Sequence, residues 1–505
     1  MQVLVFFVLI VTACLSPLLT AAHVWQLKEW RWDRLKEHLR AEGWFRQLFG
    51  VVRPLFLGLF GLIGFLGLLR DWPFYLLGVL TALFVLQLAL RRQPMPVRTS
   101  KAVALTVLTL VLSIVLTWAA IVAGHAILGL VIPFIQPFLL AVSWALLLPL
   151  DRLLKRRIMQ KAQEIRSQNP DLTVIGITGS VGKTTTKELL AHVLRDLHPL
   201  VTPGHVNSEM GVAQWLISNL TRNERPKILI IEMGAYRRGE IRTLCSIVQP
   251  HYGVVTFIGR QHMALFGSQE ALIEAKGELI EALPPNGHAF LNGDSELCRS
   301  VRTKAKCPVT VVGTGGPADL EAFDIAETPQ GIRFTVQGLA FSVPIHGTHN
   351  VTNVLLSIAV GMHLTLPLPK IAERLRSFAP PKQTFEIRSV GPVTILDDTH
   401  NASPMSFRAA IEWARTRPSE RKILLTSGLI ELGEDQEKIH AELGGLAASV
   451  FDAVLFTHAK RAKEFERGYG KPVTVLSRDT PKISGGALLV CIGLVPPATI
   501  RRLIA

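Results

Sequence analysis

The stretch Thr173-Val-Ile-Gly-Ile-Thr-Gly-Ser-Val-Gly-Lys-Thr-Thr-Thr186 decides how the second part of this chain folds. It begins as an apolar run typical of a buried strand and passes through a turn with Gly179 and Gly182 into a helix expected at 187–197. Glycine lets the backbone approach a phosphate closely, and the free N–H groups of a helix N-terminus attract anions. The segment therefore predicts a phosphate-binding loop, although strict Walker spacing would place a glycine where Ile177 stands.

Side chains of this loop have the chemistry to bind a nucleoside triphosphate and its metal. Lys183 can reach the β- and γ-phosphates, and the Thr184 hydroxyl can ligate Mg²⁺. An ordinary glycine-rich turn before a helix is the alternative, and the Gly-Lys-Thr sequence in a strand–loop–helix context disfavours it. The residues expected to contact ATP here are Gly179, Ser180, Val181, Gly182, Lys183, Thr184 and Thr185.

Short apolar strands alternate with amphipathic helices on the C-terminal side of this loop, a pattern typical of α/β sheet proteins. We predict a central P-loop ATP-binding domain over residues 171–379 and a Rossmann-like α/β domain over residues 380–505, with Pro380-Pro381 at the junction. Residues 305–341 are interpreted as a β-rich insert of the central domain. The strands expected in the last domain are 393–396, 422–426, 453–456, 473–476 and 487–491.

The N-terminal side of the loop differs in composition. Long uncharged runs cover residues 1–22, 54–69, 73–90, 102–124 and 126–150. A bilayer core needs about 20 apolar helical residues. Residues 1–157 are therefore predicted to form an α-helical transmembrane module of about five helices, followed by a linker at 158–170. The first run has two alternatives: a cleaved signal peptide, which usually starts with positive charge, and a lipoprotein processing site at Cys14.

Basic residues predict an orientation for this module. They concentrate in residues 23–53, in residues 91–101 and directly after residue 150, and five crossings would place all three clusters on one side. The positive-inside rule makes that side the cytoplasm, so we expect a multi-pass protein of the inner (cytoplasmic) membrane with its other domains facing the cytoplasm. Tryptophans interleave with the basic residues of 23–50, which fits an interfacial amphipathic helix or a loop packed on the membrane domain.

The composition of the whole chain excludes several classes of protein. Its 505 residues are 49% hydrophobic and only 18% charged, which excludes a disordered or collagen-like chain. The five cysteines are widely spaced without a C-x-x-C pair, which argues against a zinc ribbon, a redox pair or a disulfide scaffold. About half of the net charge of +15 lies beside the membrane runs, so we expect membrane lipid, and no nucleic acid, as the partner of these basic residues.

Seven segments, in the right order, resemble the motifs of the Mur ligase superfamily, and most closely those of its D-Ala-D-Ala-adding branch. Members of this superfamily use ATP to join a carboxylate to an amine. The resemblance begins at the T-G-x-x-G-K-T-T sequence of the loop and extends over roughly residues 174–505. The other matching segments are Pro203–Val212, Ile258–Ser268, Glu274–Glu278, Gly347–Asn353, Asp397–Pro404 and Glu431–His440.

The resemblance implies a role for individual residues, whereas a single Glu at a strand end or a single His is more often structural. Lys276 resembles the lysine that CO₂ N-carboxylates in this family, which turns a cation into an anion beside Mg²⁺. His262 is similar to the ligand of a second Mg²⁺. The implied metal ligands are Thr184, Glu232, His262 and Lys276, and the implied catalytic residues are Lys183, His262 and Lys276. The further residues implied near ATP are Asn350, Asp398, His400 and Asn401, the last three on domain closure.

Three departures from the family pattern bear on activity and substrate. The family has an arginine that contacts ATP where Thr384 stands, and only Lys382 or Arg388 lie near enough in sequence to replace it. His400 stands where the D-Ala-D-Ala-adding branch usually has tyrosine. The small domain that holds the UDP-sugar end of the substrate in that branch has no counterpart, because the loop follows the last apolar run by about twenty residues. We expect a lipid-linked or membrane-proximal acceptor instead.

These features together predict a membrane-anchored, ATP-dependent amide ligase that acts through an acyl phosphate. It would add an amino acid or a dipeptide such as D-Ala-D-Ala to a cell-envelope precursor of the peptidoglycan type. A poly-γ-glutamate-type polymer synthetase is a second interpretation. A catalytically weakened Mur-like scaffold protein is a third, and the missing arginine at Thr384 is its best support.

Overall fold

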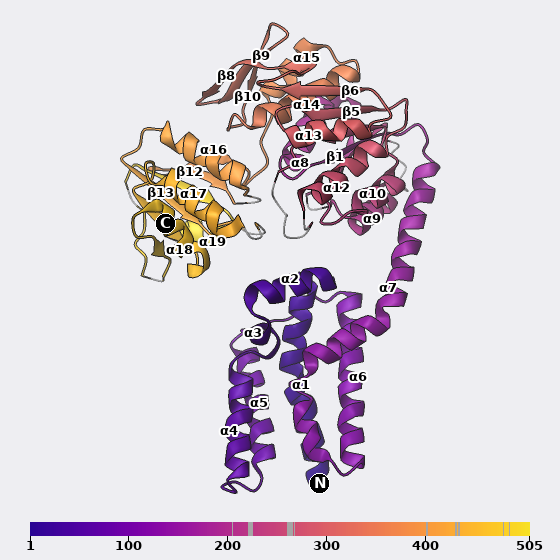
Figure 1. Ribbon diagram of the computed structural model, residues 1–505, viewed down its shortest axis with the longest axis vertical. Coiled ribbons are helices and arrows are strands. Elements are labelled where there is room, and N and C mark those ends of the chain that lie inside the picture. The colour runs from indigo at the N-terminus through magenta and orange to yellow at the C-terminus, as the bar shows by residue number, and fades with distance from the viewer. Residues whose placement is uncertain are drawn as a thin grey trace. The chain divides into compact units, whose positions relative to one another are not determined.

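The structure is a computed structural model in which the chain forms two compact units, residues 1–156 and residues 157–505 (Figure 1). The helix α7 (Gln136–Ser167) runs across the boundary between them. The structure describes all residues except 205, 221–225, 260–265, 267, 400–401, 430–431, 433–434, 478, 484 and 505, and the side chains of residues 41 and 42.

The first unit is entirely helical in its regular structure. Four of its helices are long and apolar enough to cross a membrane, judged by length and composition, whereas α4 has only 14 residues. About five spanning helices were expected, so the run at 54–69 is the one that falls short. The elements are α1 (Gln2–Leu27), α2 (Trp32–Glu42), α3 (Trp44–Phe49), α4 (Val52–Phe65), α5 (Trp72–Ala89), α6 (Ser100–Val122), the 3-10 helix η1 (Ala126–Val131) and α7.

Polar contacts hold the long helices of this unit together. Thr109 Oγ1 of α6 donates to Ser143 Oγ of α7 at 2.8 Å, a pairing suited to helix association in an apolar medium. At one end of the unit, Gln26 Nε2 donates to the Val97 carbonyl oxygen at 2.9 Å. At the same end, the Lys101 ammonium pairs with Asp151 at 2.9 Å. The end of α1, the start of α6 and the basic stretch of α7 therefore lie together at this end of the unit.

The second unit begins with the last turns of α7 and contains a seven-stranded parallel sheet with strand order β2-β3-β1-β4-β5-β6-β7. Helices pack on both of its faces, which explains why β1 and β3 are almost wholly buried and apolar. The strands are β1 (Thr173–Thr178), β2 (Leu200–Val201), β3 (Ile228–Glu232), β4 (Tyr252–Val255), β5 (His288–Asn292), β6 (Val309–Gly313) and β7 (Leu320–Glu321).

Each face of this sheet has its own hydrophobic core. One core joins the sheet to α8 (Lys183–Val193), α14 (Asn350–His363) and α15 (Leu368–Arg376). The other core joins it to the end of α7 and to the remaining helices of the domain. These are α9 (Glu209–Leu220), α10 (Glu240–Val248), α12 (Gln269–Glu281) and α13 (Glu296–Ser300), with the 3-10 helix η3 (Val301–Lys304). The 3-10 helix η2 (Arg195–Leu197) follows α8.

The expected β-rich insert at 305–341 was only partly right. Its first strand, β6, pairs in parallel with β5 and so belongs to the main sheet. The small separate sheet is antiparallel and consists of β8 (Phe323–Thr328), β9 (Gly331–Val336) and β10 (Leu339–Val343). A local apolar pattern marks a strand but carries no information about which distant strand it joins.

The last part of the chain forms a second sheet with strand order β11-β12-β16-β13-β14-β15 (yellow-orange in Figure 1). All five expected strands occur, and a sixth, β11, adds an antiparallel edge next to β12. The strands are β11 (Glu386–Val390), β12 (Val393–Asp398), β13 (Arg421–Thr426), β14 (Ala453–Phe456), β15 (Thr474–Val475) and β16 (Ala487–Ile492). The helices are α16 (Pro404–Arg415), α17 (Gln436–Ala447), the 3-10 helix η5 (Ala459–Arg461), α18 (Ala462–Tyr469) and α19 (Pro497–Ile504).

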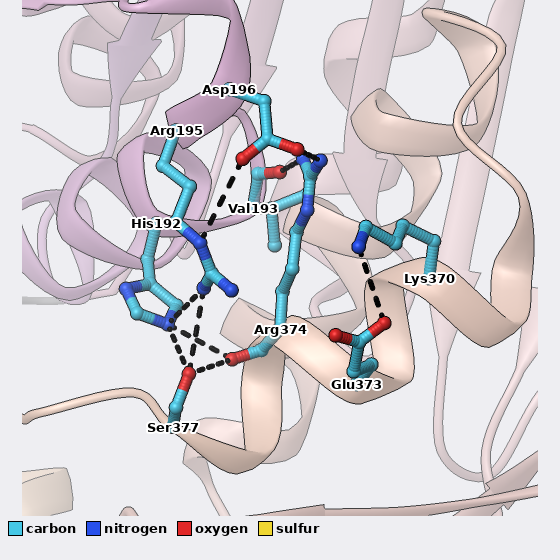
Figure 2. A network of polar contacts seen from close by, with 8 residues as sticks. All are labelled: His192, Val193, Arg195, Asp196, Lys370, Glu373, Arg374 and Ser377. Carbon is cyan, nitrogen blue, oxygen red and sulfur yellow. Dashed lines mark hydrogen bonds and ion pairs between the residues drawn. The ribbon is translucent and has the colours of Figure 1, made fainter.

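A buried arginine fastens the phosphate-loop helix α8 to α15 (Figure 2). The Arg374 guanidinium of α15 donates to the carbonyl oxygen of Val193, the last residue of α8, and to the Asp196 carboxylate of η2, which follows α8. His192 Nε2 of α8 lies 2.9 Å from the Arg374 carbonyl oxygen. These contacts hold the far end of the helix whose N-terminus forms the phosphate loop.

Replacing Arg374 by methionine should lower the free energy of unfolding of the second unit by about 2 kcal/mol, because a buried carbonyl and a carboxylate lose a charged donor. Lys370→Met is the matched control. Its ion pair with Glu373 is largely exposed, so its loss should cost less than about 0.5 kcal/mol. Urea unfolding of both variants measures the difference, and equal midpoints would contradict a clamping role for Arg374.

Candidate active site

The phosphate loop lies at the C-terminal end of β1. In the sheet, β1 lies between β3 and β4. Ligands of open parallel sheets bind at such a position. The helix α8 begins at Lys183, directly after the loop, and not at residue 187 as expected. Its early start is explained by Gly182, which caps the helix with a left-handed backbone conformation (φ +85°).

Lys183 folds back over the loop that precedes it. Its Nζ donates to the carbonyl oxygens of Gly179 at 2.9 Å and of Ser180 at 3.2 Å. Burial lowers the pKa of Lys183, and the nearby Glu232 carboxylate opposes that shift. The ammonium is therefore pre-positioned beside the loop backbone, where a phosphate would meet it together with the N–H groups of the helix.

Gly182 leaves no space for a side chain. A Cβ built on it would stand 2.5 Å from Asn353 Oδ1, in addition to the strained backbone angle. Asn353 is itself held by Thr186 Oγ1, which donates to Asn353 Oδ1 at 3.3 Å, and by Asn350 Oδ1, which accepts from Asn353 Nδ2 at 2.9 Å. The start of α14, including the predicted Asn350, is thus packed directly against the loop.

Gly182→Ala should weaken ATP binding by at least about tenfold, because the loop must move away from Asn353 and the left-handed conformation costs roughly 1–2 kcal/mol. Gly315→Ala is the control, since a Cβ at that exposed position meets nothing within 4 Å. Fluorescent-nucleotide titration of both variants compares the dissociation constants, and an unaltered value for Gly182→Ala would exclude close approach of the loop to ATP.

The side chains of Thr184 and Glu232 meet at the end of β3. Thr184 Oγ1 donates to Glu232 Oε2 at 3.0 Å, and Asn207 Nδ2 donates to Glu232 Oε1 at 3.3 Å. The fully buried Lys187 ammonium lies 3.6 Å from Glu232 Oε2 and donates to the Thr202 carbonyl oxygen at 2.9 Å. A hydroxyl and a carboxylate are hard oxygen ligands, which is the donor chemistry that Mg²⁺ prefers.

Lys187 and Asn207 were not among the predicted site residues. Lys187 stands one helical turn after Lys183, so the same face of α8 carries both ammonium groups, a spacing readable from the sequence. Asn207 belongs to the matched segment 203–212, but its contact with Glu232 depends on strand order and so required the tertiary structure.

Lys276 lies on α12 and is only 1% exposed. Its Nζ is 3.5 Å from the Ala235 carbonyl oxygen, and no closer partner exists among the described residues. Burial, reinforced by the charge of Lys183, lowers the pKa of Lys276 to about 7. A lysine in this state has a substantial neutral fraction near pH 7, and the neutral amine is the nucleophilic form. Glu278 of the same motif instead accepts from the Gly239 and Arg242 backbone N–H groups at the start of α10.

One cavity brings the loop, Glu232 and Lys276 together with residues of the last domain. Asp398, at the end of β12, is buried beside it, and burial raises the pKa of its carboxyl group to about 6. Asp398 Oδ1 accepts from the Phe385 backbone N–H at 3.2 Å, whereas its buried Oδ2 has no partner among the described residues. The predicted residues that line the cavity are Val181, Gly182, Lys183, Thr184, Thr185, Glu232, Lys276, Asn350 and Asp398.

His349, at the start of α14, lines the same cavity but was not predicted. Burial lowers its pKa to about 4, so its ring is neutral at pH 7, and the buried Nδ1 has no partner among the described residues. His349 Nδ1 and Asp398 Oδ2 are thus two buried polar atoms without a hydrogen-bond partner among the described residues. Unpaired buried polar groups of this kind fit a cavity that receives a polar ligand.

Thr384 also lines the cavity, at the position where the family has an arginine. The residues on either side of it, Gln383 and Phe385, have positive φ angles of 60° and 50°, which is uncommon for residues with side chains. Arg388, considered as a substitute, lies on β11 and pairs with Asp397 at 3.5 Å. Among the described residues that line the cavity there is therefore no arginine.

Three predicted residues, His262, His400 and Asn401, lie outside the described residues. Within the described part of the chain, no group of three or more His, Cys, Asp or Glu side chains gathers as a ready metal site. The oxygen pair of Thr184 and Glu232 is the part of the implied metal site that the structure does describe.

Comparison with known proteins matches residues 177–361 to the Mur ligase middle domain. The UDP-N-acetylmuramoyl-tripeptide–D-alanyl-D-alanine ligase of Bacillus subtilis is 32% identical over 307 residues, which cover 60% of this chain and 66% of that protein. The ligase of the same name from Mycobacterium bovis is 34% identical over 290 residues, 55% of this chain and 56% of that one. The chain thus spans between a little over half and just under two thirds of the length of these relatives.

Solved structures extend the likeness into the last domain. The crystal structure of MurF from Acinetobacter baumannii superposes with a TM-score of 0.63 at 26% identity, covering 69% of this chain and 80% of that one. MurF ligase from Thermotoga maritima in complex with ADP gives a TM-score of 0.60 at 26% identity, covering 69% and 82%. The resemblance found in the motifs is confirmed, with the apolar N-terminal unit as an extension.

Proposed function

Residues 177–361 of this chain belong to the Mur ligase middle-domain family, and from that premise we propose that the protein is an ATP-dependent, ADP-forming carboxylate–amine ligase. It adds D-Ala-D-Ala, or a related amino acid or dipeptide, to a peptidoglycan-type precursor. The observation that carries this proposal is the single cavity shared by Lys183, Thr184, Glu232 and Lys276. The names of the MurF relatives support the choice of D-Ala-D-Ala as the amine.

The chemistry explains why a ligase needs these residues. A carboxylate is a poor electrophile, so its oxygen must first receive the terminal phosphoryl group of the substrate ATP, giving an acyl phosphate and ADP. The amine then attacks the acyl carbon and releases phosphate. Phosphoryl transfer depends mainly on positioning and charge neutralisation, which the Lys183 ammonium and the N–H groups of the loop provide. The buried setting of Asp398 limits access of water to the intermediate.

Mg²⁺ fits the oxygen donors at the end of β3, where Thr184 and Glu232 would hold it. When bound, it supplies positive charge next to the phosphates. We propose that Lys276 carries the N-carboxylation that the family resemblance implies. The support is that Lys276 is buried, lines the same cavity and has its pKa lowered by burial to about 7. A second Mg²⁺ at His262 stays part of the proposal.

We further propose that the first unit lies in the cytoplasmic membrane with the ligase unit on the cytoplasmic side. The support is the four apolar helices of sufficient length and the meeting of the basic segments at one end of the unit. A helical unit occupies the chain before the phosphate loop, where a domain for the UDP-sugar would otherwise stand. An envelope acceptor linked to a lipid therefore suits this protein better than a freely diffusing one.

The test is ADP and phosphate release by the detergent-purified protein with Mg²⁺ and bicarbonate, against a panel of envelope-precursor carboxylates and amines that includes D-Ala-D-Ala. Release that requires both a carboxylate and an amine is expected. Tight ATP binding without release from any pair would instead favour the scaffold interpretation. In that case Thr384→Arg, which restores the guanidinium of the family, is the variant that should regain turnover.

A further inference from the structure

A network of polar side chains lies within the apolar first unit, and it contains one charged group. Arg53, at the start of α4, donates from its Nη2 to Ser16 Oγ of α1 at 2.8 Å. Ser16 is buried and can donate to Gln87 Oε1 at 3.1 Å or to Gln93 Oε1 at 2.9 Å. Gln93 Nε2 in turn donates to the Ser16 carbonyl oxygen at 3.2 Å and to Thr20 Oγ1 at 3.1 Å.

The Arg53 guanidinium has no acidic partner. Among the described residues, no carboxylate lies within 4.0 Å of it, and its one hydrogen bond is the one to Ser16. The carboxylates of this unit that do form ion pairs are engaged with other cations. These pairs are Arg31–Asp33, Arg34–Glu29, Lys101–Asp151 and Lys155–Asp151.

The hydrogen-bonding groups left over in this network are donors. A guanidinium has five N–H groups, and Arg53 uses one of them within the described part of the chain. The Gln87 amide nitrogen also lacks an acceptor there, while its Oε1 is accepting from Ser16. Spare donors and an uncompensated positive charge together match an anion. The planar fork of arginine suits a phosphate better than it suits a single oxygen.

The surroundings of Arg53 favour an external partner. Arg53 begins an apolar helix, and its neighbours Val52 and Leu55 expose their side chains. A charged side chain packed against apolar membrane helices is costly unless it is paired, and such residues often mark functional sites. An arginine that only extended toward water would not need the buried Ser16, which instead fixes this guanidinium against α1.

We propose that Arg53, with Ser16, Gln87 and Gln93, binds the phosphate group of a lipid between α1, α4 and α5. This inference rests on the proposed function, which places these helices in a membrane. The phosphate can come from a membrane phospholipid or from the lipid carrier of the envelope acceptor. In the second case the first unit holds the substrate and does more than anchor the ligase.

The experiment uses the full-length protein in a delipidated, uncharged detergent. Thermal shift and native mass spectrometry measure binding of a polyprenyl phosphate, of phosphatidylglycerol and of the uncharged polyprenol. Arg53→Gln should weaken binding of the phosphate lipids by about tenfold, the effect of losing a charge-assisted hydrogen-bonded pair. Arg70→Gln is the matched control, because Arg70 is an exposed arginine of the same unit that lies outside its three basic clusters. It should bind like the unmodified protein.

Equal binding by Arg53→Gln and the unmodified protein would overturn the proposal, and so would equal binding of polyprenol and polyprenyl phosphate. If Arg53→Gln does not fold, Arg53→Lys is the second variant, because it keeps the charge and loses the planar fork of the guanidinium. It should bind several-fold more weakly than Arg70→Lys, and equal affinities would again overturn the proposal. Preference for polyprenyl phosphate over phosphatidylglycerol identifies the lipid carrier, and equal affinity identifies the phospholipid headgroup. Lipid binding is measured without ATP. The result of this experiment is therefore independent of the result of the ligase assay.

Discussion

Lys183→Ala should abolish measurable ATP turnover, with a loss of at least about 100-fold to 1,000-fold in kcat. The Lys183 ammonium is held beside the loop by the carbonyl oxygens of Gly179 and Ser180, where it can neutralise charge on the transferring phosphoryl group. Alanine removes that charge and leaves the loop backbone in place. The measurement is ADP release under the conditions of the ligase assay, with the variant and the unmodified protein at equal concentration.

Two controls make the result specific. Lys306→Ala removes an exposed lysine of the same domain and should leave turnover unchanged. Membrane insertion of Lys183→Ala should also be unchanged, because Lys183 belongs to the second compact unit and the apolar helices belong to the first. Turnover by Lys183→Ala at the level of the unmodified protein would mean that the loop does not act on ATP.

Lys276→Ala should reduce ligase activity by about 100-fold or more, and added bicarbonate should not restore it. The Lys276 side chain is buried and lines the shared cavity. Among the described residues that line the cavity, Lys183 and Lys276 carry the amines that CO₂ could modify, and alanine removes the second of them. The unmodified protein, depleted of CO₂, should regain activity when bicarbonate is added. Retention of full turnover by Lys276→Ala would refute the N-carboxylation.

The pH dependence follows from the lowered pKa of Lys276. With a pKa of about 7, the amine is mostly protonated below pH 7 and mostly neutral above it. Since only the neutral amine reacts with CO₂, activity at a fixed concentration of dissolved CO₂ should fall as the pH drops through 7. Asp398, with its pKa raised to about 6, keeps its negative charge over the upper part of that range. A profile that is flat between pH 6 and pH 8 would argue against a titrating lysine.

Local patterns predicted most of the elements in the second unit. The strands expected at 453–456 and 487–491 occur as β14 and β16, because an apolar run between turn residues has few alternatives. The edge strand β11 escaped prediction, since its residues Glu386–Val390 are only partly buried and have no continuous apolar run. The start of α8 was placed four residues too late, because the conformation of Gly182 cannot be read from its neighbours.

The sequence by itself determined the class of this protein. The strand–loop–helix of 173–186, the ordered motifs after it and the uncharged runs before it are local features. Each of them can be interpreted physically from its own residues. Only the tertiary structure decided which groups share the site. Lys187 meets Glu232 because β3 lies next to β1, and Asp398 reaches the cavity from a sheet more than two hundred residues away in sequence from the loop. The same holds for Arg53 and Ser16, which are 37 residues apart. Contacts of this kind depend on how elements pack, and no local pattern of residues encodes that.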